Sequence, residues 1–413
     1  MTASTWEAII LSSVRHCGTP CYVYAYEPIE AAFRQIDCLQ CSVPVRQWLS
    51  FKTQPVAPVI RCWRRLGHGV EVVSEFEVLA ARKEGYPASR ILVNGVGKHR
   101  WLERASTRGI RVHFDSLTEI RALRKVAVSE GWQVGIRCHV AEECDPDEPQ
   151  YGGQFGLMPD EVRIGTQLLR DAGLEVDSVH FHLRTMVTSP SAYRRALIEL
   201  SDICKEADLR PHYVDCGGGL PVAEARTSKG PCAEGAFDLV AFGKVLSEVP
   251  SLFPECEEIW LENGRFLTAR AAVLVIRVLD IKDRPDSRYL ICDGGRTNHA
   301  LVSDWECHRL FTIPRRGGPP QHTTVCGPNC MAYDRLARCD LPSDIEVGDI
   351  VVWADAGAYH VPWETRFSHG LAPVVWCDES GRLWVGRRRE SFSEWWRPWG
   401  SMAGLGESNE ESP

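Results

Sequence analysis

Several polar residues able to do chemistry stand at the ends of short apolar segments in this chain of 413 residues. Lys52 follows the segment "WLSF", and Glu262 and Arg265 follow "EIWL". A lysine whose surroundings lower its pKa can form a Schiff base, and an arginine can bind phosphate through paired hydrogen bonds. Other residues in comparable places are Glu71, Arg137, His182, Gly217, Gly218 and Gly219.

This set predicts a site for a phosphate-bearing cofactor. The run of three glycines at 217–219 lets backbone N–H groups approach a phosphate closely. Glu262 is suited to accept a hydrogen bond from a protonated pyridine nitrogen, and His182 is suited to stack on a ring. Each residue alone has an ordinary structural interpretation, such as a tight turn or a surface lysine. Their joint occurrence indicates pyridoxal phosphate.

The segments that carry these residues alternate with helical patterns from about residue 45 to 265. About eight strand-then-helix units predict a TIM (β/α)8 barrel with a parallel sheet. Catalytic groups of such barrels lie at the carboxyl ends of the strands, so we expect the residues to meet at one mouth. The predicted strands fall in 48–51, 69–74, 91–95, 111–116, 133–140, 176–183, 212–219 and 258–265.

The sequence pattern changes after residue 265. Strand-like runs separated by Gly, Pro, Asp and Asn predict a second, mostly antiparallel β domain, to which "CYVYAY" near the N-terminus adds a strand. We expect the barrel to cover 27–265 and the β domain 1–26 plus 266–398. The polar tail at 399–413 is typical of a disordered segment.

The composition excludes some classes of function. With 44% hydrophobic and 25% charged residues the chain resembles a globular protein, and a formal charge of −8 argues against a nucleic-acid partner. No apolar run approaches the roughly 20 residues that span a bilayer. We see no signal peptide, so the 17 cysteines predict reduced thiols in a cytoplasm. Cys38 and Cys41 form a CxxC without a second pair, and no metal is predicted.

Several motifs occur in the order found in one known family. The chain resembles the fold-type III pyridoxal-phosphate-dependent decarboxylases, the ornithine and diaminopimelate decarboxylase group, over about residues 20–375. The motifs that carry the resemblance are "SFK", "GVEVVSEFEV", "HFH", "DCGGGLP", "ENGR", "CDGG", "GPNCMAYD" and "DAGAYH".

The resemblance implies roles for individual residues. Lys52 would carry pyridoxal phosphate, His182 would pack on its ring and Glu262 would pair with the pyridine nitrogen. It also implies a homodimer with shared active sites, in which Cys330 reaches the partner's site and protonates the α-carbon after CO₂ leaves. The alternative for Cys330 is a small buried side chain. Further cofactor-binding residues would be Glu71, Arg137, Thr185, Gly217, Gly218, Gly219, Gly264, Arg265 and Tyr359.

The chain departs from the family pattern at three informative positions. Arg184 stands where the family has Gly, and Asn263 stands where it has Pro, which leaves the phosphate geometry open. Met331 replaces the acid that holds the distal end of ornithine, lysine or diaminopimelate, and a buried ammonium without a counter-charge is costly. We therefore expect a conjugated or non-standard amino acid as substrate, bound to a carrier protein or belonging to siderophore or antibiotic synthesis.

The substrate contacts and the function have alternatives. "CDGGRTNHAL" and "FSHGLAPVVW" resemble decarboxylases of siderophore and antibiotic pathways, and the predicted substrate contacts are Arg296, His299, Met331 and Asp334. A decarboxylase of free ornithine or diaminopimelate, a racemase, and a cofactor-free binding protein of the antizyme-inhibitor kind remain open. The acidic loop at 142–149 would be a docking element or a solvated loop.

Overall fold

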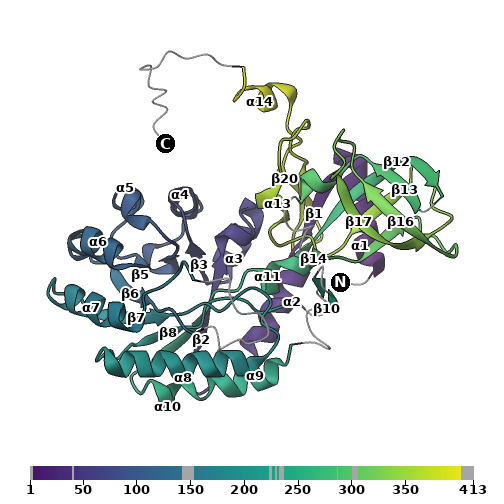
Figure 1. Cartoon of the computed structure of the whole chain (residues 1–413). Helices are drawn as coiled ribbons and strands as arrows, with labels where there is room; N and C mark the ends of the chain where they lie inside the picture. The colour runs from purple at the N-terminus through teal and green to yellow at the C-terminus, as the bar shows by residue number, and fades with distance from the viewer. Residues whose placement is uncertain are drawn as a thin grey trace.

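Two sheets organise the chain in the computed structural model (Figure 1). One is a closed barrel of eight parallel strands, and the other is a nine-stranded, mainly antiparallel sheet. The predicted fold class, a TIM barrel with a mostly antiparallel β domain, is confirmed. The residues described are 3–39, 41–141, 153–222, 226–227, 230–231, 237–285, 287–299 and 306–400.

The barrel closes because β11 pairs with both β8 and β2. Its strands are short and largely buried, as expected of a parallel sheet covered by helices. In chain order they are β2 (Val45–Ser50), β3 (Gly69–Val72), β4 (Ile91–Val93), β5 (Arg111–Phe114), β6 (Gln133–Arg137), β7 (Val176–His180), β8 (Tyr213–Asp215) and β11 (Glu258–Leu261).

Helices cover the outside of the barrel and begin at local signals in the sequence. Ser74 and Ser116 accept N–H groups in the first turns of α4 and α6, and Gly131 ends α6 in the left-handed conformation. The segment after β4 gives only the short α5, not the longer helix that its pattern predicts. The helices around the barrel are α2 (Tyr26–Asp37), α3 (Ala57–Arg65), α4 (Glu75–Lys83), α5 (Leu102–Ala105), α6 (Leu117–Glu130), α7 (Pro159–Arg170), α8 (Pro190–Glu206), α9 (Leu239–Leu246), α10 (Val249–Leu252) and α11 (Arg265–Thr268).

The second sheet begins with the N-terminal strand. After α1 (Ala3–Cys17), β1 (Cys21–Ala25) lies between β12, to which it is antiparallel, and β19, to which it is parallel. The remaining strands are β12 (Ala272–Arg284), β13 (Ser287–Cys292), β15 (Leu310–Ile313), β16 (Pro320–Cys326), β17 (Arg335–Pro342), β18 (Ile350–Trp353), β19 (Val374–Cys377) and β20 (Leu383–Arg387).

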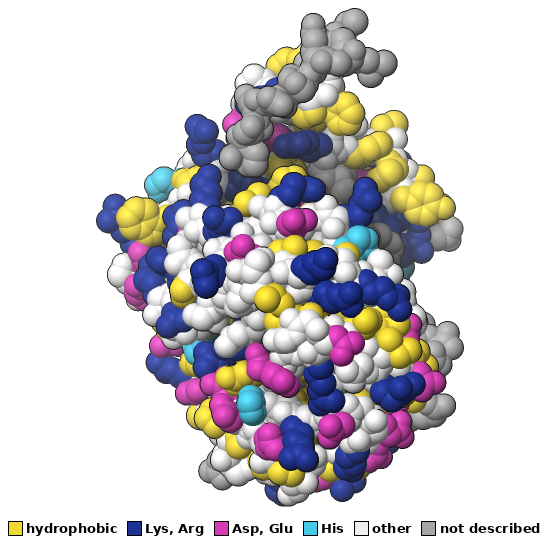
Figure 2. All heavy atoms as spheres, turned by 90° about the vertical axis from the view of Figure 1, so that its left-hand side faces the viewer, with side chains coloured by type: hydrophobic (Ala, Val, Ile, Leu, Met, Phe, Trp, Pro, Cys, Tyr) yellow, Lys and Arg dark blue, Asp and Glu magenta, His cyan; other side chains and the backbone are white. Residues whose placement is uncertain are grey.

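Smaller elements complete the chain. A three-stranded sheet joins β9 (Arg226–Thr227) to β10 (Gly230–Pro231) and β14 (Glu306–Cys307), and the short helices α13 (His360–Trp363) and α14 (Phe392–Trp396) follow the large sheet. The predicted acidic loop at 142–149 and residues 401–413 of the predicted disordered tail lie outside the described residues. Among the described helices, none is long and apolar enough to cross a membrane. Figure 2 shows basic and acidic side chains interspersed over the helical face of the barrel.

Candidate active site

Lys52 lies directly after β2, in the short helix η1 (Phe51–Thr53). Its Nζ is 3.6 Å from Oε1 of the buried Glu71 on β3, and its own side chain is 47% exposed. Burial opposes the charged form of Lys52, but Glu71, Tyr359 and Glu262 outweigh this effect and raise the lysine pKa above its ordinary value. These negative charges therefore favour the protonated amine of Lys52.

Glu71 is fixed by its neighbour on the preceding strand. The hydroxyl of Ser50 donates to Oε2 of Glu71 at 2.7 Å, which leaves Oε1 to face Lys52. The backbone of the Lys52 turn is tied to the second sheet, because the N–H of Tyr359 donates to the carbonyl of Thr53 at 2.9 Å. Lys52 thus lies at the barrel mouth beside Glu71, whose orientation is fixed by the hydrogen bond from Ser50.

Glu262 follows β11 and lies among buried polar groups. The Asn94 amide donates to its Oε1, and the Nε2 of His180 lies 3.6 Å from the same oxygen. Asp215, which ends β8, is also fully buried and accepts the Gly217 N–H through Oδ1 at 2.8 Å. Burial and the negative charges of Asp215 and Glu71 raise the pKa of Glu262.

His182 lies beside the run of three glycines. The Gly218 N–H donates to its Nδ1 at 3.1 Å, so the neutral ring carries its proton on Nε2. Burial and the positive charges of Arg137 and Lys52 lower the pKa of His182 to about 3. The ring is therefore neutral at ordinary pH and suited to stacking.

The glycines are required by close packing. A Cβ at Gly217 would lie 2.6 Å from the Phe181 carbonyl oxygen, and one at Gly218 would lie 2.5 Å from that of Glu262. Gly219 has φ +104, and a Cβ there would lie 2.3 Å from the carbonyl oxygen of Arg184. No side chain fits between this loop and its neighbours, so only glycine allows packing this close.

Arg265 begins α11 and joins several of the predicted phosphate residues. Its guanidinium lies 4.9 Å from the ring centre of Tyr359, and its Nη2 donates to the hydroxyl of Thr185 at 3.4 Å. Its Nη1 donates to Glu306, a residue that the sequence did not single out. A Cβ at Gly264 would lie 2.1 Å from Oγ1 of Thr53, so the turn before Arg265 also requires glycine.

Arg137 ends β6 and is mostly buried. Its Nη1 lies 3.6 Å from Oδ1 of Asp115, and its guanidinium lies 4.4 Å from the ring centre of Phe155. Burial lowers the pKa of Arg137, although Asp115, Glu262 and Glu71 oppose this. The positive charge of Arg137 therefore acts on both Lys52 and Glu262 at the barrel mouth.

The two departures near the glycines have structural uses. The buried Arg184 donates through Nη1 to the carbonyls of Thr185 and Met186, at 3.1 and 2.6 Å. Asn263 donates through Nδ2 to Oε1 of Gln47 on β2 at 2.8 Å. Arg184 therefore braces its own loop, and Asn263 ties the end of β11 to the first barrel strand.

Cys330 lies in a loop after β16, a strand that Figure 1 places on the side of the sheet away from the barrel. Its side chain is exposed, and Met331 beside it is half-buried. Buried Asp334 holds this loop, accepting from the N–H of Arg296 at 2.7 Å and from Asn329 N–H and Nδ2 at 2.9 and 2.8 Å. The Asp334 carboxylate is buried and its hydrogen bonds stabilise the loop, so we do not retain Asp334 as a substrate contact.

His299 is placed away from any open surface. It is fully buried, with its ring 5.1 Å from that of His360 and 4.6 Å from that of Trp353. A substrate has no access to such a ring, and we do not retain His299 as a substrate contact. Arg296, in η6 (Arg296–Asn298), is only half-buried and stays a prediction.

The residues that sequence reasoning did not single out are Asn94, His113 and Glu306. Asn94 follows β4 directly, so the rule that placed the other candidates at strand ends could have found it. His113 lies within β5 and Glu306 in β14, and neither belongs to a motif.

These residues fit the predicted cofactor on two observations. Nε of Arg265 is buried with no hydrogen-bond partner among the described residues, as expected of a donor that awaits an anion. The glycine loop also joins His182 to Glu262, since the Gly218 N–H donates to Nδ1 of His182 and a Cβ at Gly218 would lie 2.5 Å from the Glu262 carbonyl oxygen. Together they offer donors for a phosphate and a carboxyl group for a ring nitrogen.

Comparison with known proteins agrees with this geometry. A family model described as "Pyridoxal-dependent decarboxylase, pyridoxal binding domain" matches residues 29–269. The diaminopimelate decarboxylase of Archaeoglobus fulgidus is 27% identical over 408 residues, covering 92% of this chain and 93% of its own. The lysine/ornithine decarboxylase of Selenomonas ruminantium is 27% identical over 335 residues, covering 79% and 82%.

A solved structure shares the whole fold. Diaminopimelate decarboxylase from M. jannaschii, in complex with L-lysine, superposes with a TM-score of 0.83 at 21% identity, covering 95% of this chain and 94% of its own.

The similarity overturns the prediction of a conjugated substrate. Diaminopimelate decarboxylases match this chain along nearly its whole length, in Archaeoglobus fulgidus and also in Aquifex aeolicus, where the identity is 24% over 393 residues. The prediction was wrong because it rested chiefly on Met331. The absence of an acidic residue at position 331 does not exclude a substrate whose distal end holds both an ammonium and a carboxylate group.

Proposed function

Because the chain belongs to the pyridoxal-dependent decarboxylases, with pyridoxal phosphate as cofactor, we propose that it decarboxylates a free amino acid, diaminopimelate being the favoured substrate. The observation that carries the substrate proposal is the full-length similarity to diaminopimelate decarboxylases. Loss of one carboxyl group from diaminopimelate, replaced by a proton, leaves lysine. The M. jannaschii structure holds L-lysine.

Each cofactor-facing residue has a proposed task. Pyridoxal phosphate supplies an electron sink for the charge left on the α-carbon when CO₂ departs. Arg265, Thr185, Tyr359 and the glycine loop would hold the phosphate. His182, neutral because its pKa is about 3, would pack against the ring without adding charge.

Lys52 must lose a proton before its amine can react. The Oε1 of Glu71, at 3.6 Å from Nζ, is placed to take this proton. Ser50 holds the other oxygen of Glu71, so the acid keeps its orientation during the transfer. We propose that Lys52 and Glu71 act as this pair.

Diaminopimelate fits Met331 better than ornithine does. The distal end of ornithine is a lone ammonium, which is costly to bind without an acid. The distal end of diaminopimelate holds an ammonium and a carboxylate together, so the substrate's own carboxylate largely balances the ammonium charge. Arg296, whose N–H is fixed by Asp334, is the proposed contact for the distal carboxylate.

We propose that the enzyme is a homodimer in a reducing cytoplasm. The hydrogen bonds of Asp334 and Asn329 hold the Cys330 loop together and tie it to Arg296 and Thr297 in η6, and the thiol is exposed. Such a thiol can serve the barrel of a second chain, where it would donate a proton to the α-carbon. The cysteines whose side chains the structure describes are free thiols.

The substrate proposal is tested by release of CO₂ from diaminopimelate, ornithine and lysine with pyridoxal phosphate present. We expect CO₂ and lysine from diaminopimelate, and none from any substrate with Lys52→Ala. Faster release from ornithine would refute the choice of substrate.

The shared site is tested by co-expressing two inactive variants, Lys52→Ala and Cys330→Ala. Random pairing of such chains in a symmetric dimer should restore about a quarter of normal activity, because half of the dimers hold one complete site. Recovery should be absent if each chain supplies both residues to its own site.

A further inference from the structure

A line of buried charged side chains leads from Arg265 into the second sheet. Nη1 of Arg265 donates to Oε1 of Glu306, and Oε2 of Glu306 lies 3.0 Å from Nε2 of His308. On the other side of the ring, Nδ1 of His308 lies 2.8 Å from the carbonyl oxygen of Ala354. The side chains of Arg265, Glu306 and His308 are 6%, 7% and 5% exposed, so salt screens these contacts little.

The two hydrogen-bond partners of His308 decide its charge. The carbonyl oxygen of Ala354 can only accept. The Glu306 carboxylate can also only accept, because burial, which favours its protonated form, is outweighed by Arg265 and His308, and its pKa falls to about 2. A neutral histidine has one N–H and would leave one of these two contacts without a proton. Both ring nitrogens of His308 must therefore donate, which makes the ring an imidazolium.

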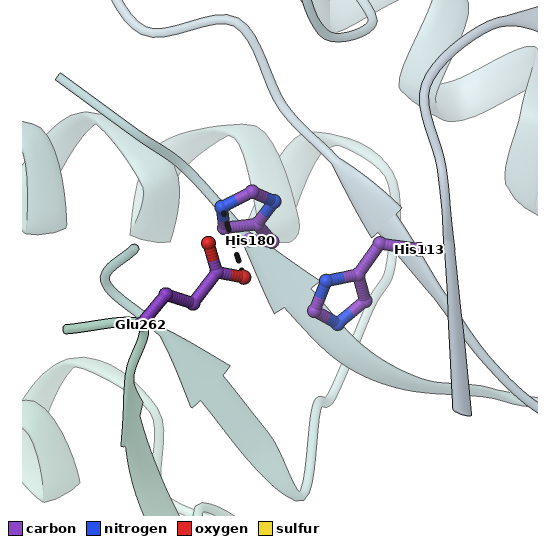
Figure 3. Close-up of side chains that lie close together, drawn as sticks. All are labelled: His113, His180 and Glu262. Atoms are coloured by element: carbon purple, nitrogen blue, oxygen red, sulfur yellow. Dashed lines mark ion pairs between the residues drawn. The ribbon is translucent and has the colours of Figure 1, made fainter. Parts of the chain in front are cut away.

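The histidines inside the barrel have no such requirement. Figure 3 shows His113 and His180 beside Glu262. Nε2 of His113 lies 2.9 Å from the hydroxyl of Ser178, a group that can donate as well as accept. Burial lowers the pKa of His113 to about 3, so this ring is neutral at ordinary pH. The positive charge of His308 thus follows from its two acceptors.

The rings packed against His308 are uncharged. The ring centres of His360 in α13 and Trp353 in β18 lie 5.1 and 5.0 Å from that of His308, and His299 stacks on His360 at 5.1 Å. Burial, and after it the positive charge of His308, lowers the pKa of His299 and of His360 well below the ordinary value. Both rings are neutral, so Glu306 is the group among these contacts that balances His308.

Arg265 keeps one hydrogen-bond donor open for an anion. Its Nη1 donates to Glu306 and its Nη2 to Thr185, whereas its buried Nε has no partner among the described residues. An anion at Nε would share the guanidinium with the Glu306 carboxylate, and two negative charges close together in a buried site repel. With the second proton on His308, the side chains of Arg265, Glu306 and His308 carry a net positive charge, and without it they carry none.

We propose that His308 is a positioning residue for the phosphate of the cofactor. As an imidazolium it balances the charge of Glu306, so that Glu306 orients Arg265 without repelling the phosphate that Arg265 binds. Loss of the second proton of His308, as the pH rises, weakens the binding of the phosphate. His308 acts through Glu306 and Arg265, and the inference rests on the proposed binding of phosphate by Arg265.

The test compares pyridoxal phosphate with pyridoxal, which has the same ring and aldehyde but no phosphate. The dissociation constants of both ligands are measured by absorbance with the apo-protein at pH 7 and pH 9, where the phosphate has the same charge because its second pKa is about 6. We expect His308→Gln to raise the dissociation constant of pyridoxal phosphate about tenfold at pH 7, a typical strength of coupling between two bound species, and to leave that of pyridoxal unchanged.

At pH 9 the wild type and His308→Gln should bind pyridoxal phosphate more nearly alike, because wild-type His308 has then lost its second proton. Burial raises the pKa of Asp215 to about 7, so this acid also titrates between the two measurements, but it is present in both proteins. His322→Gln is the matched control. His322 is 59% exposed and lies 3.7 Å from Asp340, and its replacement should change neither dissociation constant.

Three results would overturn the proposal: unchanged binding of pyridoxal phosphate by His308→Gln at pH 7, equal weakening of pyridoxal phosphate and pyridoxal, or the same loss at pH 7 and pH 9. If His308→Gln does not fold, the wild type decides. Its preference for pyridoxal phosphate over pyridoxal should fall between pH 7 and pH 9, and a constant preference would refute the proposal. Binding to the apo-protein requires neither turnover nor substrate, so its outcome is separate from that of the proposed decarboxylation.

Discussion

Glu306→Gln tests how the protein holds Arg265 for an anion. The two side chains are 6% and 7% exposed and form an ion pair, and His308 also contacts Glu306 at 3.0 Å. Removing one member of a buried pair costs about 3–5 kcal/mol. Burial by itself would raise the pKa of Glu306, but Arg265 and His308 lower it from 4.5 to about 2. That shift corresponds to about 3 kcal/mol, in agreement with the mutational range.

We therefore expect Glu306→Gln to lower the unfolding free energy of the apo-protein by about 3 kcal/mol. With saturating pyridoxal phosphate, Glu306→Gln should lower the unfolding free energy by less than about 1 kcal/mol, because the bound phosphate replaces the negative charge that the variant no longer places beside Arg265. The measurement is urea unfolding followed by tryptophan fluorescence, with and without cofactor. An equal loss in both states would refute the reasoning.

The acid pH dependence gives a second check on this pair. Because the folded-state pKa of Glu306 is depressed, its contribution is present above pH 4.5 and is lost as the pH falls toward 2. Glu306→Gln should flatten this part of the stability curve. Glu346→Gln is the control, because Glu346 is 72% exposed in its pair with Arg316 and should change stability by less than about 1 kcal/mol.

Two further predictions concern the glycine loop and its histidine. Gly219→Ala should destabilise the protein by more than about 2 kcal/mol and abolish cofactor binding, because the added Cβ would clash with the Arg184 carbonyl oxygen. Gly173→Ala is the control. Gly173 has φ +78 and nothing within 4 Å of an added Cβ, so this change should cost only about 1 kcal/mol in thermal unfolding. Between pH 5 and 6.5 the unfolded wild-type chain protonates His182 but the folded chain does not, so the stability of the apo-protein rises with pH in this range. His182→Gln should make this rise smaller. An unchanged slope would contradict a folded-state pKa of about 3 for His182.

Much of the barrel could be predicted from sequence. Runs such as "EIWL" and "RVHF" are short and apolar and are followed by polar residues, and strands of a parallel barrel bring those residues to one end. The places of Lys52 and Glu262 after their strands followed from this rule, and the structure puts Nζ of Lys52 3.6 Å from Oε1 of Glu71 on β3.

Other parts of the site depend on contacts between distant segments. Glu306 lies 41 residues from Arg265 in sequence, and its pairing appears only after the small sheet places β14 beside α11. His299 follows a polar turn and seemed open to a substrate, but Trp353 and His360 enclose it. Met331 misled for a different reason, because the charge balance of a substrate end depends on the substrate as well as on the protein.

We propose that Lys52 carries pyridoxal phosphate at the barrel mouth. The most direct test is borohydride reduction of the protein with bound cofactor, followed by digestion and mass spectrometry. We predict that the cofactor mass is found on Lys52 and is absent from that position in Lys52→Ala. Modification of buried Lys98, which pairs with Glu119 at 2.8 Å, with Lys52 unmodified would contradict the claim.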